Sequence, residues 1–164
     1  MANVDAADPR EVAARGLRLS GMDYVQAIFA GELPAPPISE LMGFRGVSAE
    51  PGRAVFEMEP GPQHYNPIGS VHGGVALTLL DSAMGCAVHT LLEPGVGYTT
   101  LEVKTNFVRP ITADTGVIRC EGVVIHRGSR VATAEGKLTG PGGKLLAHGT
   151  TTCLIFPARL AEDA

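Results

Sequence analysis

Residues 66–74, with the sequence NPIGSVHGG, place an amide, an imidazole and two successive glycines next to one another. Two glycines in succession allow a backbone turn to approach a bound ligand closely. The long apolar segment that follows predicts a helix, whose first free N–H groups and positive dipole end would point at the same place. Such a helix end polarises a carbonyl and stabilises a developing oxyanion. His72 and Asn66 would add hydrogen bonds there.

Asp81 carries the only formal charge between Gly73 and Leu92. Burying a lone carboxylate is costly unless other groups satisfy it, and perturbed carboxylates cluster at functional sites. We therefore expect Asp81 to take part in chemistry. The structural alternative is an aspartate that is bonded to the backbone or hydroxyls of a neighbouring chain.

These residues require a helix that holds them in place. Residues 75–92 are apolar on nearly every side, and no proline interrupts them before Pro94. A helix that is apolar all round is buried in a core. A membrane span is the competing interpretation, and Asp81 in the middle of the segment argues against it.

The rest of the chain predicts short helices followed by strands. Alternation, β-branched residues and turn signals indicate antiparallel strands after Gly97. Ala132, Ala134 and Gly136 form one small face that would let a sheet approach the helix closely. We predict an α+β domain in which a small curved antiparallel sheet wraps one long helix. The expected elements are a weakly patterned tail over residues 1–20, helices over 22–30 and 38–44, and strands over 53–59, 101–107, 117–125, 132–138 and 145–156.

Composition limits the class of protein. The chain has 164 residues, 45% of them apolar, which suits one globular domain, here residues 21–164. The net charge is -4 and no basic cluster occurs, so nucleic acid is not expected as a partner. Cys86, Cys120 and Cys153 have no disulfide or zinc spacing. Reduced thiols and a polar, acidic N-terminus favour a cytoplasmic location.

The pattern Asn66-x5-His72-Gly73-Gly74-x6-Asp81-Ser82 resembles the hotdog thioesterase superfamily. Within it, the motif is most similar to the phenylacetate-pathway (PaaI-like) acyl-CoA thioesterases and the related 4-hydroxybenzoyl-CoA thioesterases. The resemblance covers about residues 41–156, including the strand that precedes Arg109-Pro110. It implies a hotdog fold and hydrolysis of an acyl- or aryl-CoA thioester to free acid and coenzyme A.

The resemblance also implies roles for individual residues. Gly73 matches the glycine whose N–H polarises the thioester carbonyl, and Asp81 matches the carboxylate that attacks it or activates water. Asn66 matches a residue that positions water or the thioester. His72 matches a histidine that supports the loop, and Thr100 matches a hydroxyl near the water, with Thr99 as its adjacent competitor.

Arg127 and Arg130 flank a predicted turn, in a region where family members often hold coenzyme A phosphates. A solvated turn is the alternative for these two residues. The other histidines, at positions 64, 89, 126 and 148, match no catalytic position and are interpreted as structural or surface residues. No cluster has metal-ligand spacing, and no Gly-x-Ser-x-Gly elbow indicates a serine hydrolase.

Two other functions compete with hydrolysis. One is a hotdog hydratase or dehydratase acting on enoyl or hydroxyacyl thioesters, which usually has a differently spaced histidine and carboxylate. The other is a non-catalytic acyl-CoA binder. For the hydrolase we expect no metal or redox cofactor, since coenzyme A enters as part of the substrate.

Helix geometry predicts an oligomer. Gly73 and Asp81 lie eight positions apart, which is about 12 Å along a helix axis. One thioester carbonyl does not easily contact both. An antiparallel helix from a second chain would bring its Asp81 opposite the first chain's Gly73, as in a two-fold homodimer. The resemblance implies the same, with higher oligomers such as homotetramers common.

Overall fold

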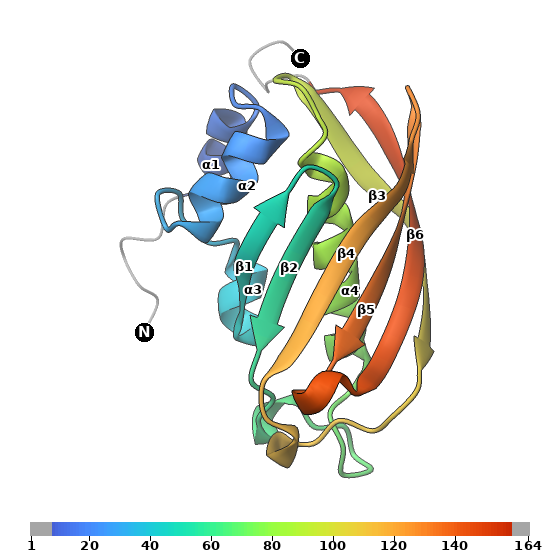
Figure 1. The fold of residues 1–164 in the computed structure, drawn as a ribbon. Helices are drawn as coiled ribbons and strands as arrows, with labels where there is room; N and C mark the ends of the chain where they lie inside the picture. Colours follow the sequence, from blue (N-terminus) through green and yellow to red (C-terminus); the bar gives the residue numbers. More distant parts are fainter. Residues whose placement is uncertain (1–7, 159–164) are drawn as a thin grey trace.

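The computed structural model describes residues 8–158. A six-stranded antiparallel sheet curls round one long helix, α4, as Figure 1 shows. The strand order is β1-β2-β4-β5-β6-β3. This confirms the predicted α+β class and the helix wrapped by a sheet. The elements are α1 (Pro9–Gly16), α2 (Gly21–Phe29), α3 (Pro37–Met42), β1 (Phe44–Glu50), β2 (Arg53–Met58), α4 (Gly73–His89), β3 (Val96–Phe107), β4 (Ile118–Arg127), β5 (Val131–Thr139) and β6 (Leu145–Pro157).

Small residues of the sheet allow α4 to pack closely. Ala132 and Ala134 are completely buried, which agrees with the small face predicted for this strand. A Cβ at Gly136 would lie 2.9 Å from Leu80 Cδ2. A Cβ at Gly122, which the sequence pattern did not single out, would overlap the backbone of Ala83. The helix backbone therefore rests almost directly on β4.

The side of α4 that faces away from the sheet is open. Leu77 is 39% exposed, and Asp81 and Ser82 are half-buried. The prediction of a helix buried on every side is therefore wrong for this stripe. The physical reason is that the sheet encloses only one side of the helix, and no strand within residues 8–158 covers the other.

The N-terminal region differs from the predicted tail. Residues 1–7 lie outside the described part of the chain, but Pro9–Gly16 forms the helix α1. Asp8 caps this helix by accepting a hydrogen bond from the N–H of Arg10 at 2.9 Å. Gly16 lies against the ring of Tyr24 in α2. The helix is short and mostly polar, which is why its apolar pattern was too weak to predict it.

Helix α2 is anchored at the C-terminal end of α4. The N–H of Gly21 donates to the carbonyl of Leu92 at 2.9 Å. A Cβ at Gly21 would overlap the carbonyl of His89, so this close approach requires glycine. In Figure 1, α1 and α2 accordingly lie together beside the end of α4 that is farther from its start.

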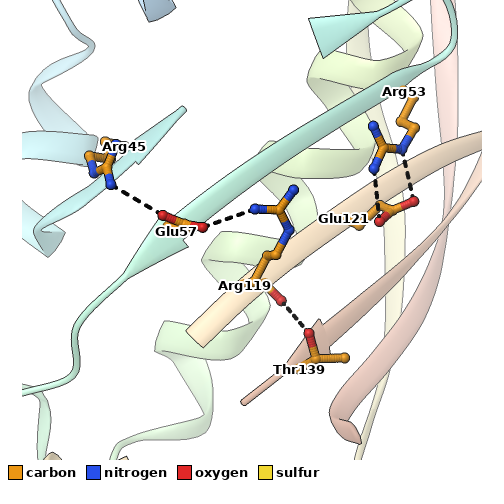
Figure 2. Close-up of polar contacts among 6 residues, drawn as sticks. All are labelled: Arg45, Arg53, Glu57, Arg119, Glu121 and Thr139. Carbon is orange, nitrogen blue, oxygen red and sulfur yellow. Dashed lines mark hydrogen bonds and ion pairs between the residues drawn. The ribbon is translucent and has the colours of Figure 1, made fainter. Parts of the chain in front are cut away.

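Charged side chains pair across the outer face of the sheet, as Figure 2 shows. Glu57 binds both Arg45 at 3.2 Å and Arg119 at 2.9 Å. Arg53 donates two hydrogen bonds to Glu121, at 2.9 and 3.2 Å. Cross-strand pairs of this kind support strand register, although each exposed pair stabilises the fold by only about 0–1 kcal/mol.

The strand β3 forms one edge of the sheet. It pairs only with β6 within the described chain. Leu101 and Phe107 on this strand are 57% and 60% exposed. An edge strand presents unpaired N–H and C=O groups with which another chain can pair. Among the described residues, no helix is long and apolar enough to cross a membrane.

Candidate active site

The loop before α4 is shaped by Asn66. Its side-chain Oδ1 accepts hydrogen bonds from the N–H groups of Ile68 and Ser70, at 3.0 and 3.2 Å. Its Nδ2 donates to Ser70 Oγ at 3.1 Å. Gly69 has a φ of 85°, which closes the turn and favours glycine. The side chain of Asn66 thus organises the loop. Its role in positioning water or the thioester stays a prediction.

His64 holds this loop to the rest of the domain. Its Nδ1 accepts from the N–H of Gly61 at 2.9 Å, and its Nε2 lies 3.1 Å from the carbonyl of Met42. Its own carbonyl accepts from the N–H of His72 at 2.8 Å. With both ring nitrogens engaged, His64 is a structural histidine, as the sequence analysis interpreted it.

His72 is the N-cap of α4. Its Nδ1 accepts from the N–H of Gly74 at 2.9 Å, which satisfies one of the free donors of the first turn. Gly73 is the first helical residue, and its N–H has no acceptor within the helix. A Cβ at Gly73 would lie 3.0 Å from Phe107 Cζ, so the aromatic ring closes one side of the helix start.

His72, Gly73 and Phe107 line a surface hollow of about 380 Å³, here called the Gly73 hollow. Ser70 and Arg109 also line it. A backbone donor at a helix N-terminus, beside an apolar ring, suits the carbonyl oxygen of an ester or thioester.

Asp81 lies in a second, larger space. Thr100 Oγ1 donates to Asp81 Oδ1 at 2.9 Å, joining the middle of α4 to β3. Thr99 is exposed on the other face of the strand, because side chains alternate along it. The structure thus brings together Asp81 and Thr100, rather than Thr99. Both line a cavity of about 430 Å³ between α2, β1 and the open side of α4, here called the Asp81 cavity.

Asp81 itself is half-buried, whereas the apolar segment around it predicted a buried carboxylate. The open side of α4 explains the difference, since nothing else from the described chain covers it. Among the described residues, no hydrogen bond involves the second carboxylate oxygen, while Asp81 as a residue lines the cavity. A carboxylate held in this way is oriented for attack or for proton transfer.

One chain does not unite the two groups of candidate residues. Gly73 and His72 line the Gly73 hollow, while Asp81 and Thr100 line the Asp81 cavity. Arg127 and Arg130 are exposed and line neither of these spaces. In Figure 1 the turn that holds them, between β4 and β5, lies at the end of the sheet away from the start of α4.

Most residues that line the Asp81 cavity were not predicted as part of the site, and Tyr24, Tyr98 and His89 are three of them. Tyr98 precedes Thr100 by two positions, so strand alternation placed it on the same face. His89 lies eight residues, about two helical turns, after Asp81. This spacing indicates that both side chains lie on the same face of the helix. The position of Tyr24 depends on how α2 packs, and nothing local in the sequence indicates it.

Burial changes the acidity of several groups around this cavity. It raises the pKa of the Cys86 thiol to about 12, with the nearby Asp81 charge adding to the effect. Burial also raises the pKa of Tyr98 well above its ordinary value and lowers that of His89. Near neutral pH, Cys86 is therefore a thiol and His89 an uncharged imidazole.

Comparisons with known proteins agree with this fold and motif. The family model described as "Thioesterase superfamily" matches residues 68–147. The 1,4-dihydroxy-2-naphthoyl-CoA hydrolase of Listeria monocytogenes is 28% identical over 74% of this chain and 98% of its own length. Human acyl-coenzyme A thioesterase 13 is 30% identical over 65% of this chain and 75% of its own length.

Among solved structures, a phenylacetic acid degradation-related protein from Ralstonia eutropha is 29% identical with a TM-score of 0.73. The match covers 80% of this chain and 98% of that one. The chain belongs to the thioesterase superfamily. It has the hotdog fold, and it is a thioester hydrolase.

Proposed function

We propose that the protein hydrolyses an acyl- or aryl-CoA thioester to a free acid and coenzyme A. The observation that carries this proposal is Asp81, whose carboxylate is held by Thr100 at 2.9 Å and which lines a cavity of about 430 Å³. Relatives whose names specify CoA thioesters support the choice of coenzyme A as the leaving group.

Hydrolysis in this site needs an attacking oxygen and a place for the oxyanion. Asp81 either removes a proton from water or attacks the carbonyl carbon itself, and both routes start from the same carboxylate. The N–H of Gly73 stabilises the negative oxygen of the tetrahedral intermediate. The carbon–sulfur bond then breaks and the sulfur leaves as coenzyme A thiol after taking up a proton. If water attacked, the free acid forms in the same step. If Asp81 attacked, an acyl anhydride remains on Asp81, and water then hydrolyses it to the free acid and the Asp81 carboxylate. This reaction consumes water alone, so a metal or redox cofactor is not part of the proposal.

A homodimer would complete the site. The open stripe of α4 and the outer edge of β3 are not covered by another strand within residues 8–158. A partner chain running antiparallel there would bring its Asp81 to the Gly73 of the first chain. Arg127 and Arg130 are exposed on the β4–β5 turn, and their contact with the coenzyme A phosphates is part of the same proposal. A homotetramer built from two such dimers also remains a proposal.

The experiment that tests the function measures the release of free thiol from a panel of short, medium-chain and aryl acyl-CoAs. We expect turnover with thiol release for at least one class. Loss of enoyl-CoA absorbance without thiol would instead identify a hydratase. Saturable binding without either signal would identify a non-catalytic binder. The cytoplasmic location stays a prediction from the sequence, supported by three unpaired cysteines.

A further inference from the structure

Strand β3 contains a β-bulge directly after Thr100. Cys153 and Thr152 are neighbours in the sequence of β6. Their partners on β3 are Thr100 and Glu102, which are two positions apart. Leu101 is therefore the extra residue of a bulge. Bulges re-aim side chains and are common next to active sites, so this one bears on where Thr100 points.

The bulge allows both halves of β3 to present the required face to α4. Before it, Tyr98 and Thr100 line the Asp81 cavity. After it, Val103 packs against the core and the Phe107 ring lies at the start of α4. Thr100 and Val103 are three positions apart, and in an uninterrupted strand such residues lie on opposite faces. The bulge therefore lets Thr100 reach Asp81 while Val103 stays in the core.

Thr151 on β6 holds the bulge from the inner face of the sheet. It is 1% exposed, and its Oγ1 donates to the carbonyl of Glu102 at 2.7 Å. On the outer face, Thr152 Oγ1 donates to the carboxylate of the same Glu102 at 2.9 Å. Only the bond from Thr151 fixes the backbone of β3, because the other joins two side chains.

The surroundings of Thr151 are otherwise apolar. Its partners in the sheet are Val103 on β3 and Ala134 on β5. Burying a hydroxyl among such residues is unfavourable unless it forms a hydrogen bond, and a valine would fill the same space without that cost. The bond to the Glu102 carbonyl is thus what the hydroxyl contributes at this position.

A second contact links Thr151 to Thr100. Cys153 is the sheet partner of Thr100 and lies two positions after Thr151, on the same face of β6. Burial raises the pKa of the Cys153 thiol, and the neighbouring hydroxyls of Thr151 and Thr100 act in the opposite direction. The three side chains therefore lie in one row, from the bulge to the residue that bonds Asp81.

We propose that Thr151 is a positioning residue: its hydroxyl holds the bulge at Leu101, and the bulge keeps Thr100 bonded to the Asp81 carboxylate. Thr151 lines neither the Asp81 cavity nor the Gly73 hollow, so its effect on the reaction passes through the backbone of β3. This inference rests on the proposed hydrolysis and adds a residue that orients its carboxylate.

The test is a double-mutant cycle on thiol release from the fastest substrate of the acyl-CoA panel. Thr151→Val removes the hydroxyl at similar shape, and we expect kcat to fall about tenfold with KM within about twofold of wild type. Thr151→Ser restores the hydroxyl and should keep kcat within about threefold of wild type. In a Thr100→Val background, Thr151→Val should change kcat by less than about twofold, because the hydroxyl that it positions is already absent.

Two controls separate positioning from a general loss of stability. Thr152→Val removes the neighbouring hydroxyl, which bonds the Glu102 side chain on the outer face. Thr90→Val removes another buried hydroxyl, which donates to the Ala87 carbonyl at 2.7 Å and lines neither space. Both should keep kcat within about twofold of wild type, even where a thermal melt shows a lower Tm. If Thr151→Val does not fold, Thr151→Ala takes its place in the cycle.

A crystal structure of Thr151→Val gives a result that does not depend on activity. We expect the 2.9 Å bond between Thr100 Oγ1 and Asp81 Oδ1 to be lost. The inference would be overturned by an unchanged bond, by an equal loss of kcat in both backgrounds, or by a Thr151→Ser variant with the kcat of Thr151→Val. No thiol release from any acyl-CoA by the wild-type protein would reject the proposed function, and the crystal structure would still decide whether Thr151 positions Thr100.

Discussion

Asp81 and Thr100 show how much of a site can be predicted at the scale of single residues. The isolated charge at Asp81 was visible in the sequence, because it interrupts an apolar helix. The choice of Thr100 over Thr99 needed the phase of the strand, which the structure provides through the 2.9 Å hydrogen bond. The exposure of the face of α4 that carries Asp81 was not predictable from the sequence, because it depends on how far the sheet wraps round the helix.

Replacing Asp81 by Asn keeps the shape of the side chain and removes its charge. We expect turnover to fall at least ~100-fold, the usual scale for a positioned acid or base, with the fold intact. The control is Asp114→Asn, at an exposed aspartate outside both spaces, which should change turnover by less than about twofold. Thiol release and a thermal melt measure the two effects. An Asp81→Asn protein with most of its activity would rule out the carboxylate mechanism.

The proposed donor at Gly73 can be removed without breaking the helix. Proline lacks the N–H and is well accepted at the first helical position. His72 has φ -61° and ψ 135°, the extended conformation that suits a residue before proline. We expect Gly73→Pro to lower kcat about 100-fold or more, as for loss of an oxyanion donor.

Gly73→Ala is the control for this variant, because it adds a Cβ against Phe107 as proline does but keeps the N–H. If both variants lost the same activity, crowding by Phe107 would explain the result and the donor role would be rejected. A large loss in Gly73→Pro alone supports the donor.

Of the three cysteines, Cys86 is the one that lines the Asp81 cavity. Because burial raises its pKa to about 12, the thiolate becomes abundant only as pH rises toward that value. Between about pH 6 and 9 we therefore expect Cys86→Ala to keep the wild-type shape of the pH–rate profile. Its turnover should stay within about threefold of wild type. Two results for Cys86→Ala would point to a cysteine nucleophile. One is loss of the alkaline side of the pH–rate profile, and the other is loss of turnover while substrate binding is preserved.

At the scale of elements, the sequence predicted those whose patterns were long or strictly alternating. Helix α4 and strands β2 to β6 were expected within a few residues, because burial on a defined face leaves a clear period. The helix α1 was missed, because its few turns depend on capping by Asp8 and contact with Tyr24 rather than on a pattern of its own. The close approach of β4 to α4 at Gly122 was missed for a similar reason, since a glycine in a strand does not reveal its neighbour.

Gly122 provides a test of that packing. A Cβ there would overlap the backbone of Ala83, which cannot move aside as a flexible side chain would. We expect Gly122→Ala to lower the free energy of unfolding by about 1–3 kcal/mol or more, the range for overpacked cores. In Gly140→Ala the added Cβ would meet the movable Leu146 side chain at 3.3 Å, and the loss should stay below about 1 kcal/mol. Urea denaturation of both variants measures the difference, and equal stabilities would contradict the close contact.

At the scale of the whole molecule, the described chain keeps the two groups of candidate residues apart. The helix start with its donor lines one space, and the carboxylate lines another, about 12 Å away along the axis. The proposed homodimer would pack through the edge strand β3 and the exposed stripe of α4. Helix geometry alone predicted this division from the spacing of Gly73 and Asp81, although the sequence did not show which surface would pair.

Complementation tests whether two chains share each site. Each homodimer of Asp81→Asn or of Gly73→Pro should be nearly inactive, because every site lacks one group. In a mixed dimer, one site receives both damaged residues and the other receives Gly73 and Asp81 intact. Random pairing makes about half of the dimers mixed, so co-expression should restore about one quarter of wild-type activity per protein. If each chain contained its own complete site, every site in a mixed dimer would still carry one damaged residue. Co-expression would then restore nothing, and the shared site would have to be abandoned.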